Sequence, residues 1–163
     1  MASTYTPIAT QTLGSAAASV TFSSIPGTYT DLVLIANFGG SVAAQDFEYS
    51  YNGDTSSTAS DTHLFGNGTA ALSNRNSNQT RIDVDYMGLS TSLVANAIIN
   101  IMNYSNTTTF KSSLARANDT SRGTNASVGL WRSTAAITSI QLRMTSGDLL
   151  SGSTFSLYGI ASA

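Results

Sequence analysis

Short segments in which apolar and polar residues alternate recur along the chain, and they set the strongest limit on its fold. In TRIDVDY (80–86) apolar and charged residues alternate strictly, and FEYSY (47–51) repeats the pattern with aromatic residues. Such alternation is typical of antiparallel strands with one buried face. Asn52 and Gly53 follow the second segment and form a strong turn signal.

Two longer segments are apolar on both sides. They are DLVLIANF (31–38) and LVANAIINIMNY (93–104), and this pattern predicts central strands covered on both faces. A helix is the competing interpretation of the second segment, but its β-branched residues and asparagines favour a strand. In the closing segment, Phe155 and Leu157 share the face that we expect in the core, and Tyr158 lies on the opposite face.

Strand signals at a spacing of about ten residues, separated by Gly, Asn and Ser, predict an all-β fold. We expect a jelly-roll-like antiparallel β-sandwich of about eight to nine strands. Residues 1–15 are predicted to form an N-terminal arm or edge segment, and residues 16–163 a single β-sandwich domain. Residues 53–78 are strongly polar and read as a long connection with one short helical turn around Leu64.

Charge is scarce in this chain. Charged residues make up 10% of the sequence, against about a quarter in ordinary domains, and Ser, Thr and Asn fill 60 of the 163 positions. With so few charges the electrostatic field around the protein is weak, and we therefore expect no nucleic-acid partner. A weakly charged surface also resists association poorly, which suits a protein that lies against other protein copies.

The N-terminal sequence and the cysteine content bear on where the protein is made and on which covalent and metal sites it can have. The chain has no cysteine, so neither disulfides nor thiolate metal sites are available. It opens with MASTYTPIAT, which lacks the features of a secretory signal, and no apolar run reaches membrane-spanning length. We therefore expect a soluble protein, made in a cytoplasm, with no membrane partner.

No group of residues predicts catalysis, a metal site or a cofactor. His63 and Asp61 lie two residues apart among serines, but no strand–turn–helix context supports a catalytic triad, and His63 reads as a solvated loop residue. Asp83 and Asp85 would lie about 7 Å apart on one strand, within a range that glycosidases use. A solvated strand face is the favoured interpretation of that pair, and the chain is predicted not to be an enzyme.

Five segments carry a resemblance to a known family. They are FSSIPGTYTDLVLIAN, YNGD, NYSNTTTFKSSLARAN, LWRSTAAITSIQL and GSTFSLYGI. In this order, from Phe22 to Ile160, the chain resembles tailed-bacteriophage virion structural proteins of the jelly-roll type. These include capsid decoration (cement) proteins and related tail-fibre terminal domains. The resemblance implies a jelly-roll-like β-sandwich with a structural, non-enzymatic role, and it does not choose between capsid and tail.

The chain shows no repetitive shaft, heptad run or second domain, which favours a capsid decoration protein that binds the outer capsid surface and stabilises the shell. The expected partners are the major capsid protein and further copies of this chain, as a homotrimer. The expected location is the virion surface, after synthesis in the host bacterial cytoplasm. The alternative is a tail-fibre or tail-associated module that binds a carbohydrate or receptor, supported by the polar segment 53–78, the tyrosines and Trp131.

Candidate interface residues come from both ends of the chain and from the single tryptophan. If residues 2–14 form an arm rather than an edge strand, two of them would be its apolar anchors. Trp131 is favoured as a core residue, with an exposed contact as the alternative. The full set is Tyr5, Ile8, Trp131, Arg132 and Tyr158.

Overall fold

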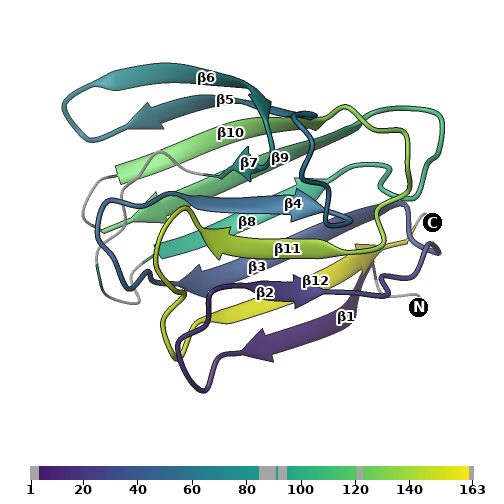
Figure 1. Cartoon of the computed structure of the whole chain (residues 1–163), viewed down its shortest axis with the longest axis horizontal. Coiled ribbons are helices and arrows are strands. Elements are labelled where there is room, and N and C mark those ends of the chain that lie inside the picture. Colours follow the sequence, from purple (N-terminus) through teal and green to yellow (C-terminus); the bar gives the residue numbers. More distant parts are fainter. Residues whose placement is uncertain (1–3, 85–90, 92–94, 121–122, 162–163) are drawn as a thin grey trace.

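The computed structural model describes residues 4–84, 91, 95–120 and 123–161, and these residues form two antiparallel sheets (Figure 1). The larger sheet has eight strands, in the order β1 (Tyr5–Thr12), β12 (Thr154–Ile160), β3 (Asp31–Phe38), β8 (Ala95–Ile101), β9 (Lys111–Asp119), β10 (Gly123–Trp131), β5 (Ala59–Gly66) and β6 (Ala71–Gln79). The smaller sheet has four, in the order β2 (Val20–Phe22), β11 (Ile140–Met144), β4 (Phe47–Tyr51) and β7 (Ile82–Asp83). Among the described residues, no helix is long and apolar enough to cross a membrane.

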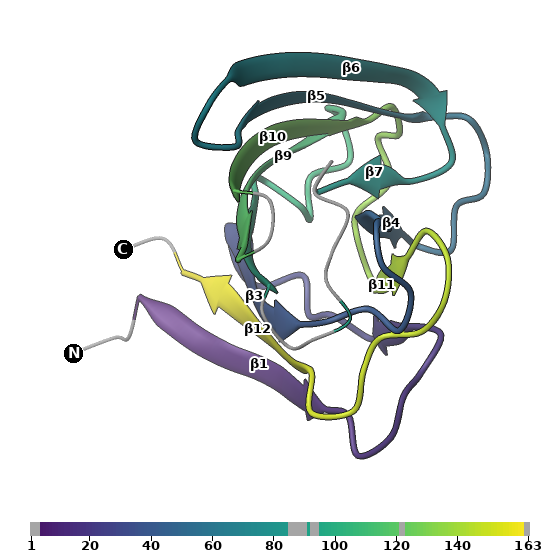
Figure 2. The same cartoon turned by 90° about the vertical axis from the view of Figure 1, so that its left-hand side faces the viewer.

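The strand order is that of a jelly roll with two insertions. Strands β1-β12-β3-β8 of the larger sheet and β2-β11-β4-β7 of the smaller one give the eight-stranded, double Greek-key arrangement. The predicted β-sandwich is confirmed. The predicted number of strands is too low, because the pairs β5–β6 and β9–β10 extend the larger sheet to a total of twelve strands. Figure 2 shows the larger sheet curving around the smaller one.

The polar segment 53–78 contains the outermost of these added strands, so its prediction as a long connection is wrong. Strands β5 and β6 pair as an antiparallel hairpin, and Leu64 is an exposed residue of β5 rather than part of a helical turn. Strand β6 is an edge strand with mostly exposed side chains, so its sequence shows no apolar alternation. The turn at Asn52 and Gly53 is confirmed, since both residues have positive φ and the Asp54 amide donates to the Tyr51 carbonyl at 2.9 Å.

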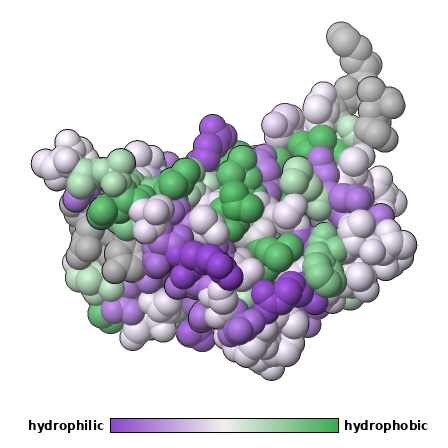
Figure 3. All heavy atoms as spheres, turned by 90° about the horizontal axis from the view of Figure 1, so that it is seen from above, coloured by the Kyte–Doolittle hydropathy of each residue, from purple (hydrophilic) through white to green (hydrophobic). Residues whose placement is uncertain are grey.

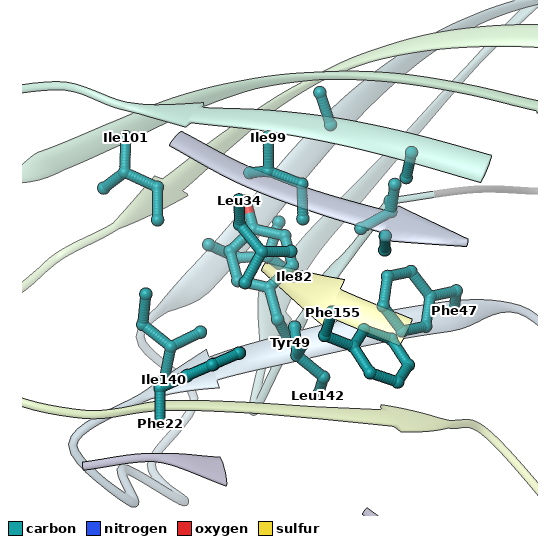
Figure 4. Packing of buried hydrophobic residues seen from close by; sticks show 14 of the residues in the cluster. Phe22, Leu34, Phe47, Tyr49, Ile82, Ile99, Ile101, Ile140, Leu142 and Phe155 are labelled. Atoms are coloured by element: carbon teal, nitrogen blue, oxygen red, sulfur yellow. The ribbon is translucent and has the colours of Figure 1, made fainter. Parts of the chain in front are cut away.

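The core lies between the sheets and is formed by alternate residues of the central strands. Leu34, Ile99 and Phe155 point inward from the larger sheet toward Tyr49 and Leu142 of the smaller one (Figure 4). Both long apolar segments contain central strands, as predicted, since β3 lies between β12 and β8 and β8 lies between β3 and β9. The predicted cover on both faces is not found, because Ile35 and Ile98 on the outward face are only half-buried. Of the alternating segment 80–86, the structure describes a strand only at β7, and residues 85 and 86 lie outside the described residues.

The closing strand β12 has the predicted facing. Phe155 and Leu157 are fully buried, whereas Tyr158 is half-buried on the opposite face. Gly159 leaves room for the ring of Tyr29, because a Cβ at this glycine would lie 2.3 Å from two of the ring carbons. The glycine is therefore required by a close approach within the fold.

Residues 5–12 form the edge strand β1, which pairs with β12. This arrangement corresponds to the edge-segment alternative for the N-terminus. The register shifts between Pro7 and Ala9, and Ile8, which lies between them, packs against the core.

Candidate functional site

A cluster of polar side chains is buried between the two sheets. Asp61 and His63 point inward from β5, and Asp83 approaches them from β7 of the smaller sheet. His63 Nε2 lies 2.7 Å from Asp61 Oδ1, and the Asp83 amide donates to Asp61 Oδ2 at 3.2 Å. One ligand-type atom from each of the three side chains lies within 4.8 Å of the other two. The cluster thus joins residues of both sheets.

Strand β6 completes this cluster. The register of the β5–β6 hairpin places Asn76 opposite Asp61. The Asn76 amide nitrogen donates to Asp61 Oδ1 at 2.9 Å and to Asp83 Oδ2 at 3.2 Å. Asn76 therefore bridges the two carboxylates and keeps them close together.

This site corrects two predictions. His63 is 1% exposed, so the prediction of a solvated loop histidine is wrong: its place on the inward face of β5 buries it. Asp83 is half-buried rather than solvated, because β7 lies inside the curve of the larger sheet. Asp85, the other half of the predicted pair, lies outside the described residues. The sequence analysis considered Asp61 with His63 and Asp83 with Asp85, but bringing Asp83 to the first pair requires the packing of β5 against β7.

Burial and neighbouring charge act strongly on Asp83. Loss of solvent, followed by the negative charges of Asp61 and Glu48, raises the pKa of Asp83 to about 7. Glu48 itself lies between two guanidinium groups, with its Oε1 3.3 Å from Arg81 Nε and 2.6 Å from Arg143 Nε. Three carboxyl groups of the described residues therefore lie near β7, and Arg143, whose side chain is 37% exposed, reaches one of them from the surface.

The surface has a hollow large enough for a substrate, and the side chains of the buried cluster do not line it. An open hollow of about 610 Å³ is lined at the end of the β5–β6 hairpin by Leu64, Leu72, Arg116 and Thr124, among others. It does not include the side chains of the buried cluster. The hollow and the buried cluster are therefore separate features, although Asn125 of β10 borders the hollow.

The predicted interface residues lie in two separate places. Tyr5 is 54% exposed, and its ring meets the ring of Tyr158 edge-on with 6.4 Å between centroids. Trp131 is buried, which is the interpretation that the sequence favoured, and its indole nitrogen donates to Asp54 Oδ2 at 2.7 Å. Arg132 donates to the Ser57 carbonyl at 2.8 Å and to Asn78 Oδ1 at 2.9 Å.

Apolar side chains cross the outward side of the larger sheet in two neighbouring rows. Cross-strand partners in register lie side by side on one face, so the pairings of β12, β3, β8, β9, β10 and β5 define these rows. We call them the outer face: Tyr158, Val33, Leu114 and Val128 in one row, and Ile35, Ile98 and Leu64 in the other. Six strands at 4.7–4.9 Å spacing make this face about 24 Å wide. Polar residues interrupt both rows, at Asn100 and Thr62 in the first and at Ser156 and Arg116 in the second, and Val33 is only 6% exposed.

The outer face combines exposed apolar area with little charge. Leu64, Val128 and Leu114 are 64%, 53% and 44% exposed. Between β12 and β10, Arg116 is the one charged side chain among the described positions of the two rows. Seen from above, apolar side chains occupy several separate areas among neutral and hydrophilic ones (Figure 3). Sequence reasoning identified Tyr158 here, but it missed Leu64 because that residue was placed in a connection.

The comparisons with known proteins leave the family of this chain open. No family model matches, and no curated protein matches. One solved structure, of the alginate lyase Aly36B, aligns with 93% of this chain and 77% of its own at 10% identity, with a TM-score of 0.34. A match at that level does not relate this chain to that enzyme.

Proposed function

We propose that this chain is a non-enzymatic structural protein of a bacteriophage virion, most closely a capsid decoration protein whose copies contact one another through the outer face. The outer face is the observation that carries the proposal. An exposed apolar band on a sheet marks an interaction surface more often than a free one. The jelly-roll strand order agrees with the fold implied by the sequence resemblance.

The occupant that suits the outer face best is a second copy of this chain. In a symmetric oligomer, excess charge of one sign on the contact surface is costly, because it either meets like charge or is buried without a partner. The outer face avoids this because its two rows contain a single arginine between β12 and β10. A homotrimer on the capsid surface, held to the major capsid protein by other parts of the surface, is the assembly that we propose.

Oligomer formation through the outer face is tested on the isolated protein by light scattering. Leu114 and Val128 are register partners on β9 and β10 and are both exposed, so replacing both by serine should leave the fold intact. Each leucine-sized side chain contributes about 1.5–3 kcal/mol when it is fully buried. We therefore expect the double variant to raise the dissociation constant at least about tenfold. Val42→Ser is the matched control, because Val42 is 42% exposed and lies outside the outer face.

Placement on the capsid is tested by stoichiometry in purified particles. A decoration protein is present in rough proportion to the major capsid protein, whereas a tail protein is far scarcer. A wild-type chain that is monomeric both at high concentration and on particles would contradict the proposed contact. A chain found at only a few copies per particle would contradict the capsid placement.

The second candidate function is the tail-associated module that binds a carbohydrate or receptor. The open hollow of about 610 Å³ favours it, because polar groups of Arg116 and Thr124 lie there beside apolar Leu72. Calorimetric titration with oligosaccharides, on the wild type and on Arg116→Ala, separates this candidate from the first. Binding that depends on Arg116, together with a low copy number, would favour the tail module.

A further inference from the structure

We propose that Asp61, His63 and Asp83 form a binding site for one Zn²⁺ ion, which ties β5 of the larger sheet to β7 of the smaller one. This inference goes beyond the proposed virion role, does not depend on it, and departs from the sequence prediction of no metal. It rests on the chemistry of the three side chains, on two buried polar atoms beside them, and on the local charge.

The ligand set and its spacing fit zinc. Imidazole nitrogen and carboxylate oxygen bind Zn²⁺ at about 2.0–2.2 Å in tetrahedral sites, so ligand atoms around one ion lie roughly 3.3–3.5 Å apart. The ligand-type atoms of Asp61, His63 and Asp83 lie within 4.8 Å of one another. His63 Nε2 and Asp61 Oδ1, now 2.7 Å apart, would open slightly as the ion replaces the proton between them. The three side chains leave the fourth position to a water molecule.

Two buried polar atoms near the cluster lack partners, and they become a donor and an acceptor for each other when His63 Nδ1 carries the ring proton. Within the described part of the chain, neither His63 Nδ1 nor Asn125 Oδ1 has a hydrogen-bond partner, although the two residues are only 1% and 3% exposed. Ser127 pairs with His63 in the β5–β10 register, so Asn125, two residues earlier on the same face of β10, lies diagonally across from His63. Diagonal neighbours are within reach of side chains of this length.

Metal binding would satisfy both of these atoms. When Nε2 binds a metal, the ring proton moves to Nδ1, and metal-bound histidines nearly always donate that proton to an oxygen nearby. Asn125 Oδ1 is a free acceptor of this kind, and its amide nitrogen is held by the Val84 carbonyl. The tautomer required by the metal is thus the one that removes both unpaired atoms.

The local charge also favours a divalent cation. Glu48 is paired with Arg81 and Arg143, so its negative charge is already balanced. Among the residues that the structure describes, the side-chain partners of Asp61 and Asp83 are His63 and the neutral Asn76. Two carboxylates in a buried site are costly unless they are paired or bind a metal, and a doubly charged cation balances both.

The chain is well suited to a direct test, because His63 is its single histidine and it has no cysteine. Tag-free, chelator-treated, ¹⁵N-labelled protein is titrated with ZnCl₂ while the imidazole nitrogens are followed by long-range ¹H–¹⁵N NMR. We expect saturation at one Zn²⁺ per chain, a metal-bound shift for Nε2, and an Nδ1–H that exchanges slowly. The thermal midpoint should rise on saturation, because the ion binds only the folded chain.

Variants connect the signal to the site. Asp83→Asn keeps the size of the side chain but removes one charged ligand, and should weaken zinc binding at least tenfold. Asn125→Ala removes the acceptor for Nδ1–H and should weaken it about 10–100-fold, as is typical of such outer partners. Asp148→Asn, in the loop between β11 and β12, is the control and should bind zinc like the wild type.

The wild type alone can overturn the proposal, even if a variant fails to fold. Unchanged His63 nitrogen signals in a fivefold excess of ZnCl₂ would show that hydrogen bonds alone hold the cluster together. A zinc affinity that is unaltered by Asp83→Asn in a folded variant would place the ion elsewhere, and would also overturn it.

Discussion

Phe155 is the residue at which the sandwich core is most directly tested by a single substitution. Its side chain is fully buried on β12. Its ring packs beside two rings that contact each other, with centroids 6.3 Å from Phe38 of β3 and 6.2 Å from Phe47 of β4, while the Phe38 and Phe47 centroids are 4.1 Å apart. The three rings join strands of both sheets, so Phe155→Ala would open a cavity whose walls are held by separate strands and collapse poorly.

The expected cost follows from that geometry. Truncation of a buried phenylalanine to alanine lowers the free energy of unfolding by about 3–5 kcal/mol. The loss of two aromatic contacts places the cost toward the upper end of this range. Domains of this size have a free energy of unfolding of about 5–15 kcal/mol. We therefore expect Phe155→Ala to remove a large share of the stability, read from urea denaturation followed by circular dichroism and by the fluorescence of the single tryptophan.

Tyr158→Ala on the same strand is the matched control. Tyr158 is half-buried on the outer face and meets Tyr5 edge-on, so its truncation should cost the monomer roughly 1 kcal/mol or less. In the proposed oligomer, by contrast, it should weaken assembly more than folding. If Phe155→Ala changed the free energy of unfolding by no more than Tyr158→Ala does, the inward facing of Phe155 and the core built on it would be wrong.

Two further predictions concern a glycine and an aspartate. Gly159→Ala places a Cβ 2.3 Å from the tyrosine ring that covers this glycine, so it should lower the free energy of unfolding by about 1–3 kcal/mol in urea denaturation. Gly14→Ala, where a Cβ meets nothing within 4 Å, should not, and an equal loss in both would refute the close approach. Hydrogen bonds from Ser56 and then from the Trp131 indole hold the pKa of Asp54 well below its usual range. Because the pKa of Asp54 is lower in the folded state than in the unfolded state, this contribution to stability is present above about pH 4 and is lost on further acidification. The urea midpoint, measured by tryptophan fluorescence as a function of pH, should therefore fall less steeply below about pH 4 in Asp54→Asn than in the wild type. An equally steep fall in both proteins would refute the prediction.

The sequence predicted the jelly-roll part of the fold well because its strands have one face in the core. In β3 and β12 the apolar positions that face inward were visible as alternation or as long apolar runs, and Phe155 and Leu157 were assigned correctly. The added strands β5 and β6 carry a different pattern. Their outward side and the sheet edge are exposed, and their inward positions hold Asp61, His63 and Asn76. Polar residues on both faces of a hairpin cannot be told from a loop by periodicity.

The same polar residues explain why the candidate metal site was not predicted. Asp61 and His63 are two residues apart, a spacing that places both on one face of a strand, and this signal would have been usable once β5 was recognised. Asp83 comes from another strand, whose position opposite β5 depends on how far the larger sheet curves. No local spacing contains that information.

The two inserted strand pairs connect the proposed site with the proposed surface. Strands β5 and β10 carry the buried cluster and Asn125 on their inward side, and Leu64 and Val128 of the outer face on the other. In a strand, successive side chains point to opposite faces, so any force that fixes β5 against β7 also fixes the rows of apolar side chains on the far side of the same backbone. An ion bound by Asp61, His63 and Asp83 would therefore stiffen the part of the outer face that extends beyond the jelly roll. Adding ZnCl₂ should then change the self-association of the wild type and leave that of Asp83→Asn unchanged. If ZnCl₂ changed the self-association of both proteins to the same extent, ion binding at the cluster would not be coupled to the outer face.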